Sequence, residues 1–190
     1  MPQYSVQVSV GTDDGFWDTT NGCFRDAGYV WMGKYSNGHE ARQHGTFRFQ
    51  DVQLDSRYKI TQARLYLNSP SEQTGVNFNL RIHLDTAADA TNVVPPGCNP
   101  EDRVLTTAYG EWTTLTAAQN AWFYSPDFAT ALQEHLDGNF VWGNALAVVC
   151  VQQDDAGSYI RAKSYEEAGA TYAAWLVVDY TYRGFAGAVI

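Results

Sequence analysis

The clearest pattern in the chain is an alternation of apolar and polar residues between Gly45 and Asp85. From Asn77 to Asp85 it is complete, with apolar side chains at every second position and polar ones between them. A period of two is that of a β-strand with one face in a core and the other in water. Several such segments in succession predict an antiparallel sheet. The alternating apolar residues are Phe47, Phe49, Val52, Leu54, Ala63, Leu65, Leu67, Phe78, Leu80, Ile82 and Leu84.

The alternation changes phase once, where Gln50 and Asp51 together occupy one polar position. Such a slip is typical of a β-bulge or a strand end, so we expect a bend there. Turn-forming residues follow at 55–57 and at 69–71, because Asp and Ser bond their own backbone and Pro fixes φ.

Further strands are expected at both ends of the chain. Tyr4, Val6, Val8 and Val10 alternate with polar residues, and the last strand alternates in the same way. By contrast, the acidic and glycine-punctuated segment from 11 to 44 has one short strand-like stretch and is otherwise irregular. The predicted strands outside the central region are 3–10, 29–32, 145–152, 159–165 and 175–182.

One helix is predicted, over 126–137. Ser125 is a good N-cap, and Pro and Asp are favoured in a first helical turn. Apolar residues at i, i+4 and i+8 form one face, and a glycine follows as a natural stop. Those residues are Phe128, Leu132, Leu136 and Gly138.

These elements predict an all-β fold, an antiparallel β-sandwich of jelly-roll type with one short α-helix. No linker divides the chain, so we expect a single domain over 1–183 and an apolar C-terminal tail over 184–190. The segment 94–100 contains three prolines, which exclude a helix interior and a strand ladder, and is expected to be a surface loop.

The net charge and the first residues of the chain argue against nucleic acid and membranes as partners. The net charge is −9 and basic residues do not cluster, so nucleic acid is not an expected partner. The first residues lack the basic and apolar parts of a secretory signal, and no apolar run is long enough for a membrane span. We therefore expect a protein that is made in the cytosol and has no membrane partner.

The three cysteines show no metal-binding spacing. Cys150 lies in an apolar run and is expected to be a buried, small hydrophobic residue. A bridge between Cys23 and Cys98 is one alternative, and free thiols are the other.

Two sets of residues are candidate ligand sites. Trp17, Tyr29, Trp31 and Tyr109 lie in predicted loops or short strands and could stack on a sugar, although packing in the core or at its edge is the alternative. The acidic pairs Asp13, Asp14 and Asp154, Asp155 supply the hard oxygen ligands that Ca²⁺ prefers, whereas plain surface acids are the alternative.

No enzyme is predicted, because the histidines lack metal spacing and no nucleophile or phosphate-loop motif is present. We expect no cofactor, and a structural calcium ion stays an alternative.

The order of motifs resembles the jelly-roll domain, akin to carbohydrate-binding modules, of bacteriophage tail and virion structural proteins. The resemblance covers about residues 3 to 182 and depends on packing and turn positions. The matching residues are Asp13-Asp14, Arg48 to Leu54, Ile60, Ala63, Leu65, Leu67, Trp112, Trp122, Ser125 to Phe128, Gly143 to Leu146, Arg161 to Tyr165 and Val178 to Tyr180.

This resemblance implies a non-enzymatic virion structural protein, either a capsid decoration or a tail accessory protein, displayed on the particle and helping host attachment. The expected location is the virion, and the expected partners are other virion proteins and copies of this chain, in a homo-oligomer that the family suggests is a trimer. The alternative is a carbohydrate-binding module that recognises a bacterial surface glycan. The resemblance also favours the calcium alternative for the acidic pairs.

Overall fold

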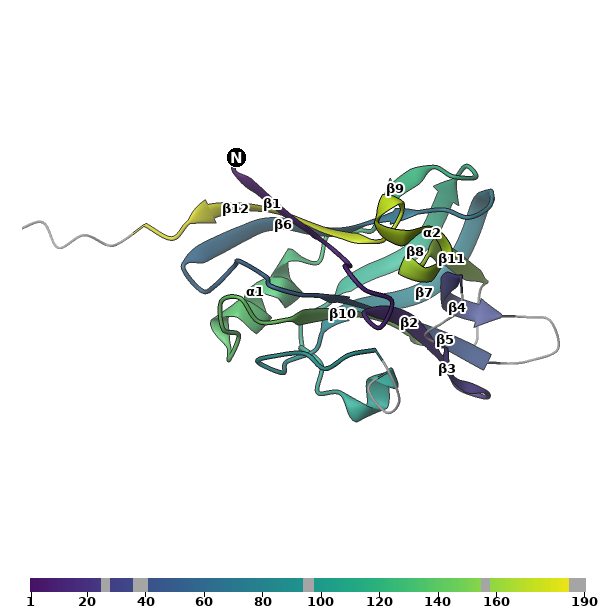
Figure 1. Cartoon of the computed structure of the whole chain (residues 1–190), viewed down its shortest axis with the longest axis horizontal. Coiled ribbons are helices and arrows are strands. Elements are labelled where there is room, and N and C mark those ends of the chain that lie inside the picture. The colour runs from purple at the N-terminus through teal and green to yellow at the C-terminus, as the bar shows by residue number, and fades with distance from the viewer. Residues whose placement is uncertain (25–27, 36–40, 94–97, 155–157, 185–190) are drawn as a thin grey trace, which may run out of the picture.

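The protein consists of two packed antiparallel sheets, as the computed structural model shows for residues 1–24, 28–35, 41–93, 98–154 and 158–184 (Figure 1). The predicted all-β sandwich is therefore confirmed. The small sheet consists of β1 (Gln3–Gln7), β12 (Trp175–Tyr182), β6 (Tyr58–Asn68) and β9 (Trp122–Tyr124), in that order. The large sheet has the order β11 (Tyr159–Lys163), β4 (Tyr29–Tyr35), β5 (Ala41–Phe49), β10 (Leu146–Gln152), β7 (Gln73–Leu84) and β8 (Gly110–Ala117), and β2 (Asp14–Asp18) pairs with β5 and with β3 (Gly22–Phe24).

The core lies between the two sheets, where the period of two places it. In β6 and β12 the inward residues Leu65, Leu67 and Leu176 are fully buried. In β7 the inward residues Leu80 and Ile82 are also fully buried, while polar residues between them face outward. The expectation that alternate residues form the core is confirmed.

The predicted bend after Phe49 is present. Strand β5 ends at this residue, and Asp51 has a φ of 51°, which belongs to the left-handed region. The chain then pairs briefly with the segment before β10, since the Val52 N–H donates to Asn144 O at 3.1 Å. The phase slip in the sequence thus marks a strand end with one residue in a strained conformation.

Helix α1 (Ala129–Asp137) begins later than predicted. Residues 125–128 follow β6 instead of forming a first turn, because Ser125 Oγ accepts the Leu65 N–H at 3.0 Å and Asp127 Oδ1 accepts the Ala63 N–H at 2.8 Å. The predicted helix start at 126 is therefore wrong. The predicted apolar face is confirmed, since all three of its members are buried: Phe128, Leu132 and Leu136.

The structure also contains short helices that the sequence did not predict. Strand β11 ends at Lys163, two residues before the predicted end, and α2 (Tyr165–Ala168) follows it. The 3-10 turns are η1 (Pro100–Asp102) and η2 (Gly169–Thr171).

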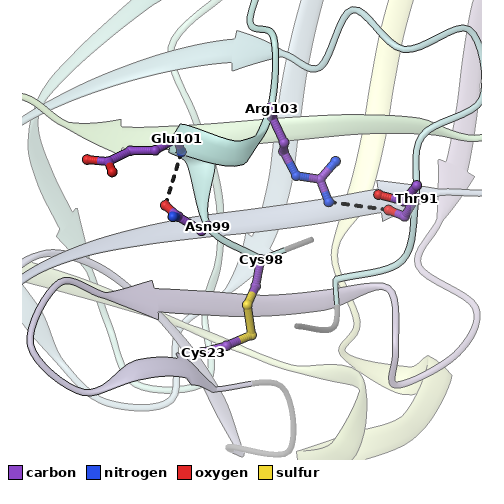
Figure 2. Close-up of a disulfide and its surroundings, with 6 residues drawn as sticks. All are labelled: Cys23, Thr91, Cys98, Asn99, Glu101 and Arg103. Atoms are coloured by element: carbon purple, nitrogen blue, oxygen red, sulfur yellow. Dashed lines mark hydrogen bonds between the residues drawn. A yellow bond between two sulfur atoms is a disulfide. The ribbon is translucent and has the colours of Figure 1, made fainter. Parts of the chain in front are cut away.

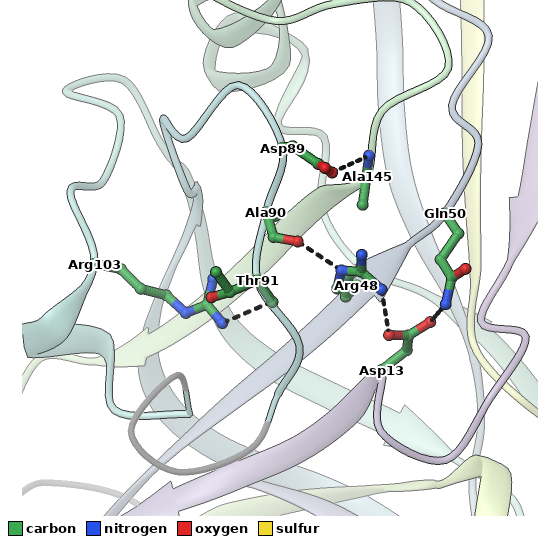
Figure 3. Close-up of polar contacts among 8 residues, drawn as sticks. All are labelled: Asp13, Arg48, Gln50, Asp89, Ala90, Thr91, Arg103 and Ala145. Atoms are coloured by element: carbon green, nitrogen blue, oxygen red, sulfur yellow. Dashed lines mark hydrogen bonds and ion pairs between the residues drawn. The ribbon is translucent and has the colours of Figure 1, made fainter.

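A long connection between β7 and β8 packs against the large sheet. Its Ala90 N–H donates to Ala145 O at 2.9 Å, and Asp89 Oδ1 accepts the Ala145 N–H (Figure 3). Ala90 and Val93 are buried, so this connection covers one end of β10. The residues 94–97 of the predicted surface loop lie outside the described residues.

The same connection is joined to the hairpin of β2 and β3 by a disulfide between Cys23 and Cys98 (Figure 2). The bridge spans 75 residues, and Cys98 is fully buried. Closing a loop of that length stabilises a folded protein by about 4 kcal/mol on the chain-entropy model. Of the two alternatives for these cysteines, the structure has the bridge, and Cys150 is free and buried.

Candidate ligand-binding surface

The predicted calcium ligand Asp13 is used inside the fold. It is fully buried, and its Oδ1 pairs with Arg48 Nη1 at 2.7 Å while its Oδ2 accepts from Gln50 Nε2 (Figure 3). Arg48 Nε also donates to Ala90 O at 2.7 Å. Arg48 therefore connects β5 to the long connection, and its guanidinium balances the charge of Asp13.

The other predicted acids lie in two separate places. Asp14 is buried at the start of β2 and accepts the Tyr165 N–H at 2.9 Å. Burial, and then the nearby carboxylate of Glu166, raises the pKa of Asp14 well above its usual value. Asp154 lies after β10 and accepts from Asn79 Nδ2 at 2.7 Å, whereas Asp155 is outside the described residues. Among the described residues, no group of three or more His, Cys, Asp or Glu is placed to hold a metal ion.

The four predicted aromatic residues are not gathered in one site. Trp17 is the cross-strand partner of His44. Tyr109 lies under the guanidinium of Arg81, which is 4.3 Å from its ring centre. Tyr29 and Trp31 do lie together on β4, opposite Lys163 and Arg161 of β11.

Tyr29 and Trp31 belong to a larger surface, which we name the aromatic band. It combines the outward side of β4 and β11 with the outer face of the small sheet near β9. In Figure 1, the labels β9, β11 and α2 lie close together at this end of the molecule. The rings of the aromatic band are Tyr29, Trp31, Tyr66, Trp122, Tyr124, Tyr159 and Tyr172.

On the small sheet the aromatic band follows from strand alternation. Leu65 and Phe123 face the core, so their neighbours face outward. The Tyr66 ring stacks on Tyr124 with a centroid distance of 4.4 Å and on Trp122 at 4.6 Å. Tyr124 remains 49% exposed, so part of this stack is open to solvent.

The aromatic band continues from Trp122 onto β11. Tyr172 follows at 6.2 Å from Trp122, and the Lys163 ammonium lies 4.2 Å from the centre of the Tyr172 ring. Along β11, the Arg161 guanidinium lies 5.1 Å from the Trp31 ring centre. Cations therefore lie over rings at several points between β9 and β4, in cation–π contacts.

A pocket of about 350 Å³ lies elsewhere, on the large sheet beside the disulfide-linked connection. His44 lines it, and burial lowers the pKa of this histidine to about 4. Its Nδ1 accepts the Gln152 N–H at 3.0 Å, which fixes the neutral ring. The described lining residues are Thr19, Arg42, His44, Pro100, Glu101, Leu105, Val151, Gln152 and Gln153.

Among these described residues there is one carboxylate, Glu101, one guanidinium, Arg42, and no pair of carboxylates. The other polar groups of the lining are neutral.

Sequence reasoning missed most of the aromatic band. The signal was present, because Tyr66 occupies the polar phase of β6, and Trp122 and Tyr124 are two residues apart and so share one face. What the sequence does not give is that β9 pairs with β6, which brings these rings together.

Comparison with known proteins adds no family. No protein-family model matches the chain, and no curated protein matches it either. The longest helix in the described part of the chain, α1, has nine residues, so no helix there is able to cross a membrane. A functional conclusion must therefore come from the surface itself.

Proposed function

We propose that this chain is a non-enzymatic, surface-displayed protein of a bacteriophage particle, and that its aromatic band binds a glycan of the bacterial surface. The observation that carries the proposal is the aromatic band. A pyranose ring has a flat face of C–H groups, and in water such a face packs favourably on an aromatic ring. The polar groups beside the rings are suited to hydrogen bonds with sugar hydroxyls.

The shape of the surface favours a particular kind of glycan. Most rings of the aromatic band lie on strands and are partly exposed, whereas His44 lines a pocket. An open row of rings is suited to the interior units of an extended chain, whereas a pocket is suited to a chain end or a small molecule. We therefore expect binding to polysaccharides and weak binding to single sugars.

A second candidate function, assembly with identical copies in the particle, is supported by a different surface. We name it the tyrosine end, and it consists of Tyr58, Val141, Trp142, Tyr180 and Tyr182. Val141 is 55% exposed and Tyr182 is 68% exposed. Exposed apolar and aromatic residues in one place are typical of contacts between proteins. The two functions are compatible, because the surfaces are separate.

The test compares two tryptophans on the outside of the fold, the half-buried Trp122 and the exposed Trp142. Trp122→Ala removes a ring of the aromatic band, and Trp142→Ala removes one of the tyrosine end as the matched control. In pull-down and calorimetry with bacterial cells and their purified polysaccharides, Trp122→Ala should weaken binding about tenfold, the loss that corresponds to about 1.4 kcal/mol. Equal binding by both variants, with circular dichroism unchanged, would contradict the proposal.

A further inference from the structure

The charge of the aromatic band differs from that of the whole chain. The chain has 21 acidic and 12 basic residues, for a net charge of −9. Three basic residues nevertheless lie among the rings: Arg64, Arg161 and Lys163. A protein of this net charge repels anions at long range, so a local group of cations indicates a place where an anion could still bind.

None of these cations forms an ion pair with a described residue. The ion pairs of the described part of the chain involve other arginines, such as Arg48 with Asp13 and Arg57 with Asp55. Lys163 Nζ instead donates to the amide oxygen of Asn120 at 2.9 Å, and Arg161 Nη2 donates to Ser71 Oγ at 2.7 Å. Both acceptors are neutral, so no carboxylate of the described residues pairs with these two cations.

The two arginines also hold unused donors. Arg64 Nε and Arg161 Nε are buried from solvent and have no hydrogen-bond partner in the described structure. These donors are therefore not satisfied by an acceptor of the described chain. On β6, Arg64 lies opposite Val177, which offers no acceptor side chain.

The acid of the small sheet and Glu167 of α2 contact other residues. Among the outward residues of the small sheet that the structure describes, Asp179 is the one acid. It is paired in register with Gln62, two positions from Arg64, and accepts from Gln3 Nε2 at 3.0 Å. On α2, the carboxylate of Glu167 lies against Gly28.

From this arrangement we infer that the aromatic band takes an anionic polysaccharide, one whose sugar rings stack on the aromatic residues while its carboxylate or phosphate groups bind Arg64, Arg161 and Lys163. The inference rests on the proposed function and names the ligand class for the same surface. Arg161 and Lys163 are two residues apart on one strand, which spaces their Cα atoms by about 7 Å. A chain that carries a charge on successive units can therefore reach both.

The experiment uses matched polysaccharides. Polygalacturonate and its fully methyl-esterified form share one backbone and differ in charge, and a phosphomannan with its dephosphorylated form separates phosphate from carboxylate. The protein should bind the charged member of at least one pair about tenfold more tightly than the neutral member. That affinity should fall as salt is raised from about 50 mM to about 500 mM.

Two variants, each of which replaces a cation with a neutral amide, test which residues bind the charged polysaccharide. Arg64→Gln and Lys163→Gln should each weaken binding of the charged polysaccharide about tenfold and change binding of the neutral form less than about twofold. Arg183→Gln is the matched control, since Arg183 is a surface cation paired with Asp137, and it should bind like the wild type.

The outcomes separate this inference from the proposed function. Equal affinity for charged and neutral forms, or unchanged affinity in both Gln variants, would overturn the anionic ligand and leave glycan binding by the rings in place. Absence of binding to cells and to every polysaccharide, with Trp122→Ala behaving like the wild type, would overturn both.

Discussion

The aromatic band and the tyrosine end both collect aromatic rings and cations, yet they treat charge in opposite ways. At the tyrosine end, Arg57 lies 5.7 Å from the Trp142 ring centre and is paired with Asp55 at 2.6 Å. In the aromatic band, Lys163 lies on a ring but binds only a neutral amide oxygen. Among the described residues, Arg57 of the tyrosine end has a carboxylate partner, whereas Lys163 of the aromatic band has none.

The two surfaces also differ in how the rings are supported. Tyr58 of the tyrosine end is 8% exposed and forms part of the core, with an edge-on contact to Tyr180 at 4.7 Å. Tyr124 of the aromatic band is 49% exposed and stacks on a neighbour that also faces outward. Figure 1 shows β12 extending at one end of the molecule and β9 at the other. Tyr58 therefore stabilises the fold, whereas part of the Tyr124 ring is in contact with solvent.

Two tyrosine variants test this difference with the largest expected effect. Tyr58→Ala removes a buried ring and should lower the free energy of unfolding by about 3 kcal/mol. Tyr124→Ala removes an exposed ring and should lower it by less than about 1 kcal/mol. Urea unfolding measures both, and similar losses would contradict the distinction between the two surfaces.

Acid should destabilise the fold through His135 of α1, the helix that ends shortly before Val141 and Trp142 of the tyrosine end. His135 is 2% exposed, and burial lowers its pKa from 6.5 to about 4, because the charged ring is poorly solvated. The folded state therefore binds fewer protons than the unfolded state between these pH values, so stability is present above pH 6.5 and is lost as pH falls toward 4.

The loss from His135 is at most about 3 kcal/mol. Urea unfolding at a series of pH values should show it, and His135→Leu should flatten the pH dependence. An unchanged profile in that variant would assign the acid sensitivity to other groups. His44 also has a lowered pKa and reduces stability as pH falls through the same range. Because His44 is present in both the wild type and His135→Leu, the difference between these two proteins reports His135 alone.

Self-association is the next effect in size. Trp142→Ala removes a 42% exposed ring from the tyrosine end and should weaken association between copies about fivefold to tenfold. Sedimentation over a range of concentrations measures this, with Trp122→Ala as the control that should associate normally. If Trp122→Ala is the variant that dissociates, the functions of the two surfaces are exchanged.

Asp14, which lies next to α2, should change the pH dependence of stability by a smaller amount and with the opposite sign. Asp14 holds the first N–H of α2, which leads to Tyr172, and its pKa is raised by burial and by Glu166. A raised carboxyl pKa adds stability below the ordinary value near 3.8, and this contribution is lost as pH rises through the folded pKa.

The measurement is the difference in stability between wild type and Asp14→Asn as a function of pH. Wild type should lose stability relative to the variant as pH rises. A difference that is constant with pH would show that Asp14 does not titrate in this range.

Strand periodicity predicted the sandwich because the alternation of apolar and polar residues within one strand shows which of its faces is buried. The alternation of Leu65 and Leu67 needs no knowledge of partners. The start of α1 could not be predicted in this way, because it depends on contacts with β6. Asp127 Oδ1 accepts the Ala63 N–H of β6 as well as the Ala129 N–H of the helix. The aromatic band depended on pairing between β6 and β9, and the disulfide on a distance between residues 75 positions apart.

The Cys23–Cys98 bridge can be reduced, so the protein has two covalent states. In a reducing cytosol both cysteines stay as thiols, so a chain made there must complete its sandwich without the bridge. The Cα atoms are 5.9 Å apart in that fold, a separation that a disulfide spans. Such a chain would gain the stability of the bridge only when it reaches an oxidising environment.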